Sequence, residues 1–200
     1  MTRAYLAFTE KGLALAQKLA SALPGTVDRC GHGGPSLADW AAEQFAHADA
    51  LIFVGAVGIA VRAIAPHCRN KAVDPAVVVL DECGHFAVPI LSGHLGGAND
   101  LARALAAVCG AVPVITTATD ANGVFAVDAW ARHQNCAVLE PGRIKRVSSR
   151  LLAGRPVRYR SEFPIAGQAP ARVVPAGEAE RADFALTPVS YTHLRAHETR

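Results

Sequence analysis

Residues 91 to 100 have the sequence Leu-Ser-Gly-His-Leu-Gly-Gly-Ala-Asn-Asp, and this stretch decides the fold that we expect. It joins an extended apolar run, Ala87 to Leu91, to a stretch with helix-like spacing, Leu101 to Val108. Glycine lets backbone N–H groups approach a ligand closely, and a helix that begins just afterwards directs partial positive charge at an anion. A glycine turn between a strand and a helix is where an open α/β sheet binds its ligand. We therefore place the candidate site here.

Two similar corners flank this turn. The run Leu51 to Val54 ends in Gly55-Ala-Val-Gly58, and the run Val112 to Ile115 ends in Thr116-Thr-Ala-Thr-Asp120. Because the carboxyl ends of parallel strands meet at one edge of a sheet, we expect the three corners to line one cleft. The residues expected there are Gly55, Gly58, His94, Gly96, Asn99, Thr116 and Asp120.

A plainer interpretation is that these glycines only form tight turns and cap helices, with Asn99 and Asp100 as the N-cap and first turn of the next helix. His94 distinguishes the two, because a short turn has no need of an imidazole, whereas a site for a carbonyl or carboxylate ligand uses one as donor, acid or base. A nucleotide is disfavoured, since the chain has no Gly-Lys-Ser/Thr ending of a P-loop and Gly93-x-x-Gly96-Gly97 is not G-x-G-x-x-G.

Apolar runs and stretches of helical spacing alternate along the first 120 residues, which predicts an α/β fold. The turn Asp81-Glu-Cys-Gly84 has hairpin-like chemistry. We therefore expect an open, mainly parallel sheet with helices on both faces and one local antiparallel excursion. The expected strands are Ala4–Phe8, Val27–Arg29, Leu51–Val54, Val77–Leu80 and Phe86–Leu91, and the expected helices are Lys11–Leu23 and a Ser36-capped helix through Phe45.

The composition changes near Asp120, so we expect a first domain over residues 1–121 and a smaller, truncated α/β central region over residues 122–188. Within this region helices are expected over 123–133 and 143–152, and a strand over 137–139. Residues 189–200 resemble translated adapter or read-through sequence. We exclude this tail, with His193 and His197, from the fold and the site.

The composition favours a cytoplasmic protein without a metal site. No run reaches the roughly 18 to 20 apolar residues that cross a bilayer, and the first residues lack a signal-peptide layout. The five cysteines are scattered and lack C-x-x-C spacing, which favours reduced thiols over disulfides or zinc.

The segment from Arg143 to Arg160 is rich in arginine and lysine and has no acidic residue. The net charge of the chain is only +3, and Tyr159 is the one aromatic residue of the segment, so a nucleic acid is disfavoured. Two interpretations stay open: a site for a small polyanionic ligand, and an exposed, solvated helix face.

Four stretches together resemble one known family: Gly55–Pro66, Lys71–Asp81, His85–Asp100 and Thr116–Asp120. They are similar to the amino-terminal domain of the cobalt-precorrin-5A hydrolases of anaerobic cobalamin (vitamin B12) biosynthesis, over about residues 1 to 120. Residues up to Pro188 resemble the start of that family's central region. We expect the family's carboxy-terminal domain to be missing from this chain.

The resemblance implies a hydrolase. Enzymes of this family open the δ-lactone on ring A of cobalt-precorrin 5A with water, and the meso carbon and its methyl group leave as acetaldehyde, which gives cobalt-precorrin 5B. Cobalt belongs to the corrinoid substrate, so the resemblance implies no cofactor and no protein-bound metal. The implied partners are the corrinoid and other cobalamin-pathway enzymes, with no nucleic acid and no membrane.

Lactone hydrolysis needs a nucleophilic water, an oxyanion stabiliser and a proton for the leaving oxygen. We assign proton transfer to His94, and binding of the oxyanion or a substrate carboxylate to Asn99 and the backbone N–H groups around Gly96 and Gly97. His85 and Asp81 form a second acid–base pair, unless they only close a turn. The other binding residues that we expect are Gly55, Gly58, Thr116, Thr117 and Asp120.

Two other functions stay open. In the first, this domain is a non-catalytic cradle for the corrinoid, and the chemistry resides in the missing domain. In the second, it is a nucleotide- or S-adenosylmethionine-binding transferase, which the absent fingerprints disfavour.

Overall fold

The computed structural model describes residues 1–31, 33–70 and 72–188, and the chain divides into two compact units. The first unit comprises Met1–Thr117 and Asp128–Val138, and the second comprises Ala118–Val127 and the described residues from Leu139 on. This division differs from the expected boundary after residue 121, because Asp128–Val138 returns to the first unit. The expected tail, with His193 and His197, lies outside the described residues.

The first unit is built on a six-stranded sheet in the order β2-β1-β3-β4-β5-β6. β1, β2, β3 and β4 run parallel, β5 is antiparallel to β4, and β6 is parallel to β5. The expected mainly parallel sheet with an antiparallel excursion is therefore confirmed. The strands are β1 (Arg3–Ala7), β2 (Thr26–Arg29), β3 (Ala50–Val54), β4 (Ala76–Leu80), β5 (Phe86–Leu91) and β6 (Val112–Pro113).

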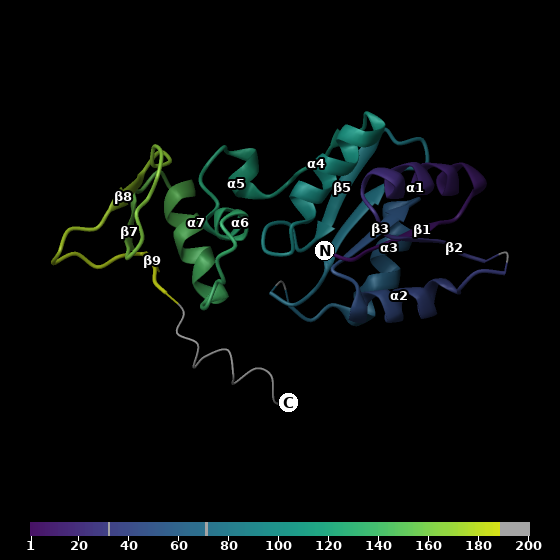
Figure 1. The fold of residues 1–200 in the computed structure, drawn as a ribbon, viewed down its shortest axis with the longest axis horizontal. Helices are drawn as coiled ribbons and strands as arrows, with labels where there is room; N and C mark the ends of the chain where they lie inside the picture. The colour runs from purple at the N-terminus through teal and green to yellow at the C-terminus, as the bar shows by residue number, and fades with distance from the viewer. Residues whose placement is uncertain (32, 71, 189–200) are drawn as a thin grey trace. The chain divides into compact units, whose positions relative to one another are not determined.

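Helices cover both faces of this sheet, as expected (Figure 1). Residues of α1 (Glu10–Ala22) and α4 (Ala98–Cys109) pack on one face, and residues of α2 (Leu37–His47) and α3 (Val57–Ile64) pack on the other. Alternate side chains of β3 enter the two cores, with Ile52 on the α1 and α4 face and Phe53 on the α2 and α3 face. A strand buried on both faces has to be apolar throughout, which explains the continuous run of β3. A short 3-10 turn, η1 (Ala65–His67), follows α3.

Local capping chemistry fixes the starts of the helices. The hydroxyls of Thr9 and Ser36 accept hydrogen bonds from backbone N–H groups in the first turns of α1 and α2, as N-caps do. α4 begins earlier than expected, because Gly97 is its N-cap in the left-handed conformation, with φ 84°. Asp100 lies in the first turn of α4, where the helix dipole favours a negative charge.

The second unit contains a three-stranded parallel sheet in the order β8-β7-β9, with α7 packed against it. Val147 and Leu151 of α7 form a small core with Val157 and Val173. The expected strand over 137–139 is wrong, because these residues pair with no strand and Leu139 is 69% exposed. The elements are α5 (Ala118–Ala121), η2 (Pro141–Arg143), α7 (Ile144–Leu152), β7 (Val157–Ser161), β8 (Val173–Pro175) and β9 (Phe184–Leu186); α6 (Val127–His133) belongs to the first unit from Asp128 on.

No helix among the described residues combines the length and the apolar character that a bilayer crossing requires.

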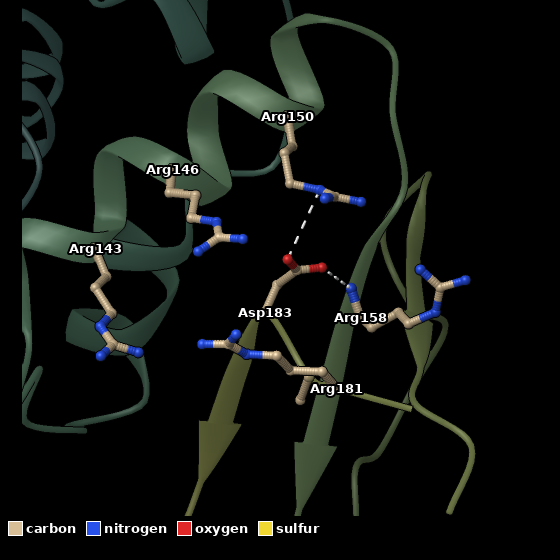
Figure 2. A pocket seen from close by; sticks show the side chains of 7 residues that line it. Arg143, Arg146, Arg150, Arg158, Arg181 and Asp183 are labelled. Carbon is tan, nitrogen blue, oxygen red and sulfur yellow. Dashed lines mark hydrogen bonds and ion pairs between the residues drawn. The ribbon is translucent and has the colours of Figure 1, made fainter. Parts of the chain in front are cut away.

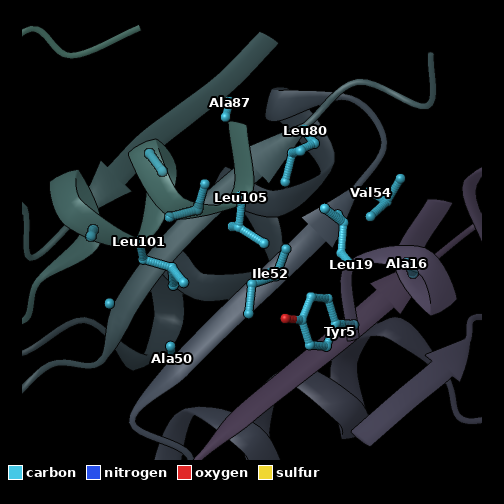
Figure 3. Packing of buried hydrophobic residues seen from close by; sticks show 14 of the residues in the cluster. Tyr5, Ala16, Leu19, Ala50, Ile52, Val54, Leu80, Ala87, Leu101 and Leu105 are labelled. Carbon is cyan, nitrogen blue, oxygen red and sulfur yellow. The ribbon is translucent and has the colours of Figure 1, made fainter. Parts of the chain in front are cut away.

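The packing of α4 on the sheet should dominate the stability of the first unit. Figure 3 shows Leu105 of α4 and Leu19 of α1 in the same cluster as Ile52 of β3. Replacing the fully buried Leu105 with Ala should lower the free energy of unfolding by about 2 to 5 kcal/mol, because a cavity adds to the lost burial. Urea denaturation measures this. Val61→Ala, at a side chain 46% exposed, is the control and should cost less than about 1 kcal/mol. Equal losses would contradict this packing.

Candidate functional site

The antiparallel step from β4 to β5 places the predicted site residues at two opposite edges of the sheet. Leu80, at the carboxyl end of β4, pairs with Ala87, near the start of β5. Gly55 lies at the first of these edges, where its N–H donates to the carbonyl of Leu80 at 2.8 Å. His94 follows the carboxyl end of β5 and lies at the other edge. The prediction of one shared cleft is therefore wrong for Gly55 and Gly58, because β5 runs opposite to β3.

The structure does bring the His94 turn together with the residues that follow β6. The side-chain amide of Asn99 donates to Thr117 Oγ1 at 3.0 Å, and Asn99 is only 3% exposed. Asn99 therefore ties the two loops to each other. Thr116 is exposed beside Thr117, whereas Asp120 lies in α5 of the second unit.

The turn itself is closed by its own backbone. Ser92 has a positive φ of 54° and is held by a hydrogen bond from its hydroxyl to the carbonyl of Asp74 at 2.9 Å. The N–H of Gly97 donates to the carbonyl of His94 at 3.0 Å. This N–H is thus used within the turn, which does not fit its predicted role as a donor to an anion. Gly96 lies against Ser92, so that an added Cβ would meet the Ser92 Cβ at 2.4 Å.

A carboxylate from a distant helix orients His94. Nδ1 of His94 lies 3.4 Å from Oδ1 of Asp128 in α6, and the two side chains are 15% and 7% exposed. Burial raises the pKa of Asp128. The hydrogen bond and charge of His94 and the backbone N–H groups at the start of α6 lower this pKa by a larger amount, so it lies below its ordinary value of 3.8. Sequence analysis missed Asp128. Its signal was a single acidic side chain within the apolar helical stretch Val127–Ala131.

A second charged cluster lies at the start of α4. The carboxylate of Asp100 pairs with Arg132, with His133 Nε2 at 2.6 Å and with Arg103 Nη1 at 3.1 Å. The guanidinium of Arg132 also lies over Gly97, where an added Cβ would approach it to 3.1 Å. A cation is therefore held against the glycine turn of the site.

The other edge of the sheet carries the second predicted pair. Oδ2 of Asp81 accepts the backbone N–H groups of His85 and Phe86, and Oδ1 accepts that of Cys83, while Nδ1 of His85 is 3.6 Å from Oδ1. Burial raises the pKa of Asp81, but these backbone hydrogen bonds lower it more, so its pKa lies below the ordinary value. A carboxylate that already accepts three backbone hydrogen bonds closes a turn and is a weak base. The turn-closing interpretation therefore describes this pair.

Two further features belong to this edge. The ring of Phe8 occupies the space where a side chain at Gly55 would lie, with Cδ2 2.6 Å from an added Cβ, so this glycine serves internal packing. Ligand atoms of Asp81, Cys83 and His85 lie within 4.8 Å of one another, in an arrangement that could hold a metal ion. Nζ of Lys11 is already 2.9 Å from Sγ of Cys83. The absence of a protein-bound metal stays a prediction.

The His94 edge has the parts of an acid–base site. A buried carboxylate facing Nδ1 favours the imidazole tautomer that carries its proton there, which leaves the lone pair on Nε2 to take up a proton. A neighbouring guanidinium can stabilise developing negative charge. Fold and site together define an α/β protein with a histidine–carboxylate pair at the carboxyl end of a strand.

Comparison with known proteins agrees with the α/β fold. Residues 39–120 match the family model described as Cobalamin synthesis G N-terminal. The resemblance found in the sequence is thereby confirmed. The chain is 46% identical over 140 residues to a cobalt-precorrin-5A hydrolase of Salmonella typhimurium, a match that covers 66% of this chain and 40% of that protein.

Two further matches extend the comparison. A cobalt-precorrin-5A hydrolase of Priestia megaterium is 48% identical over 82 residues, which cover 41% of this chain and 22% of that protein. A crystal structure of a cobalamin biosynthesis protein G homolog from Sulfolobus solfataricus has a similar fold, with a TM-score of 0.56 at 20% identity over 92% of this chain and 58% of that one. The chain thus spans less than half the length of these two curated relatives.

The contact between Gly97 and Arg132 can be tested against a matched glycine. Gly97 and Gly110 cap the two ends of α4 with φ of 84° and 83°, but an added Cβ at Gly110 meets nothing within 4 Å. Both Gly→Ala changes should lower the unfolding free energy by about 1 to 2 kcal/mol through left-handed strain. Gly97→Ala should lower the unfolding free energy by more than Gly110→Ala does, because the side chain of Arg132 must also move. Urea denaturation should show this excess disappear in an Arg132→Ala background; equal losses for both glycines would refute the contact.

The lowered pKa of Asp128 predicts how its contribution varies with pH. A carboxyl whose folded-state pKa is depressed stabilises the fold fully above its unfolded pKa, and this stability is lost as the pH falls through the folded pKa. The difference in unfolding free energy between the native chain and Asp128→Asn should thus stay constant above about pH 5 and shrink below about pH 4. Urea titrations across this range measure it. A difference that grows on acidification would mean that the pKa is raised.

Proposed function

We propose that this chain forms the amino-terminal part of a cobalt-precorrin-5A hydrolase, with a corrinoid as its substrate. The observation that carries the proposal is the buried pair of His94 and Asp128, in the unit that contains residues 39–117 of the cobalamin synthesis G N-terminal segment. The identity of 46% to a protein of that name supports the substrate class. Cobalt enters as part of the substrate, and no cofactor is needed for hydrolysis of a lactone.

His94 is the proton-transfer group in this proposal. Asp128 holds the proton of Nδ1, so Nε2 accepts a proton from the water that attacks the lactone carbonyl. The same proton then passes to the ring oxygen as the carbon–oxygen bond of the lactone breaks. The products of this step are a carboxylic acid, which ionises, and an alcohol. The hydroxyl then loses its proton as a carbonyl forms, and the bond from its carbon to the macrocycle breaks. The macrocycle keeps the electron pair and takes up a proton, and the carbon leaves with its methyl group as acetaldehyde.

The remaining residues take binding or structural roles. Arg132, held over Gly97, is placed to stabilise the oxyanion or a substrate carboxylate, together with the turn at Gly96. Asn99 mainly positions the loop that carries Thr116 and Thr117, and these two threonines line the site. A binding role for Asp120 stays a prediction from the sequence.

We also propose a cytoplasmic location and contact with other cobalamin-pathway enzymes, which supply the corrinoid and take it up. Neither a nucleic acid nor a membrane has a role in this reaction.

Measuring acetaldehyde released from cobalt-precorrin 5A tests the proposal. In a full-length family member, replacing the histidine that corresponds to His94 with Ala should lower kcat by about 100-fold or more with little change in KM, since a general acid and base is lost. Replacing the carboxylate that corresponds to Asp128 with Asn should lower kcat by about tenfold or more and alter its pH profile, because the imidazole tautomer is no longer held.

Two further changes in the same full-length protein serve as controls. Replacing the residue that corresponds to His47, in α2, with Ala should leave turnover unchanged. Replacing the residue that corresponds to His85 with Ala tests the second predicted pair. Turnover that survives loss of His94 while binding weakens would make this histidine an anchor for a carboxylate. Release of acetaldehyde by the full-length protein, but not by this chain alone, would favour the non-catalytic cradle.

A further inference from the structure

The second unit contains a cavity of about 160 Å³ whose wall is mostly arginine (Figure 2). Five arginines line it, and a single carboxylate accompanies them. The lining residues are Arg143, Arg146, Arg150, Arg158, Arg181, Ala182 and Asp183.

The acidic partners of these arginines leave two of them uncompensated. Asp183 is shared, with Oδ1 3.7 Å from Nε of Arg150 and Oδ2 accepting the backbone N–H of Arg158 at 2.9 Å. The side chains of Arg158 and Arg143 pair with glutamates outside the lining, at 3.0 Å each. Among the described residues, the side chains of Arg146 and Arg181 have neither a hydrogen bond nor an ion pair.

The side chains are arranged around a common space. Figure 2 shows Arg146 of α7 and Arg181, just before β9, extending toward the same region beside Asp183, whereas the guanidinium of Arg158 points away from it. The two uncompensated cations thus converge on the cavity from different elements.

This arrangement opposes the stability of α7. Arg143 is the N-cap of the helix and Arg146 lies in its first turn, where the positive end of the helix dipole disfavours cations and no acidic residue is present. Arg150 continues the same face one turn later, so like charges are repeated along it. The opposite face, with Val147 and Leu151, packs into the core. Core packing therefore explains the apolar face, but it does not explain the arginines.

We propose that this cavity binds a small oxyanion that carries several negative charges, of the phosphate or polycarboxylate type. Planar guanidinium groups bind such anions through paired, charge-assisted hydrogen bonds. The excess of cations over carboxylates calls for more than one negative charge, and the size of the cavity limits the ligand to a small molecule. This site is independent of the hydrolysis proposed for the His94 edge.

Calorimetric titration of this chain with inorganic phosphate, diphosphate and citrate at constant ionic strength tests the site. Arg146→Gln and Arg181→Gln should each weaken binding by about tenfold or more, the usual effect of one charge-assisted hydrogen bond. Arg155→Gln is the matched control, because Arg155 is exposed in the same unit and does not line the cavity. It should change binding less than about twofold.

The anions distinguish the two sources of the ligand. Binding of phosphate or diphosphate without citrate supports a phosphorylated ligand, and binding of citrate alone supports a polycarboxylate. Arg146→Lys, which keeps the charge without the planar fork, should recover part of the affinity.

Thermal unfolding separates binding from a structural role. Without ligand, Arg146→Gln should melt at or above the temperature of the native chain, because like charges are removed from the amino end of α7. The ligand should raise the melting temperature of the native chain and not that of the variant. Failure of all three anions to bind at millimolar concentration would overturn the proposal. Equal weakening by Arg155→Gln, or retention on duplex DNA near physiological salt, would also overturn it.

Discussion

The carboxylate of Asp81 accepts three backbone N–H groups in the turn between β4 and β5, and the direction of the chain after this turn depends on that interaction. Gly84 completes the reversal in a left-handed conformation, with φ 72°. β5 and β6 therefore run against the four parallel strands. The lowered pKa of Asp81 keeps the carboxylate ionised, and an ionised carboxylate accepts N–H donors best.

The reversal gives the unit two edges at which strands end. A glycine corner and a helix start are found at both, but their contents differ. At the β3 end, the aromatic ring of Phe8 fills the space over Gly55. At the β5 end, the left-handed Ser92 and Gly97 shape a turn that α6 completes with Asp128 and Arg132. Backbone strain and buried charge gather at this second edge, as they do at functional sites.

The sequence predicted the features that depend on nearby residues. The apolar run of β3, the Ser36 cap of α2 and the hairpin chemistry of Asp81–Gly84 are local, so the core strands and the antiparallel excursion could be predicted. The edge of the sheet at which a loop lies depends on the direction of the strand before it. The prediction that Gly55 and His94 share a cleft did not take into account that the chain reverses its direction at the Asp81 turn. Asp128 could not be assigned, because its partner is brought to it only by tertiary packing. Strands β8 and β9 have only three residues each, and β7 alternates apolar residues with arginines, so their patterns are too short or too polar to predict strands.

The two units balance their cations in different ways, and the difference bears on function. In the first unit, Asp100 compensates Arg132 and His133, so this cluster is stable without a ligand. In the second unit, Arg146 and Arg181 line a cavity with five arginines and a single carboxylate, Asp183, which pairs with Arg150. A chain tolerates an unfavourable local arrangement, such as a buried charge or cations at the start of a helix, when another interaction offsets it. For Asp128 that interaction is the imidazole of His94, within the fold. The described part of the chain holds no such partner for Arg146 and Arg181, and an anion from solution would complete their arrangement.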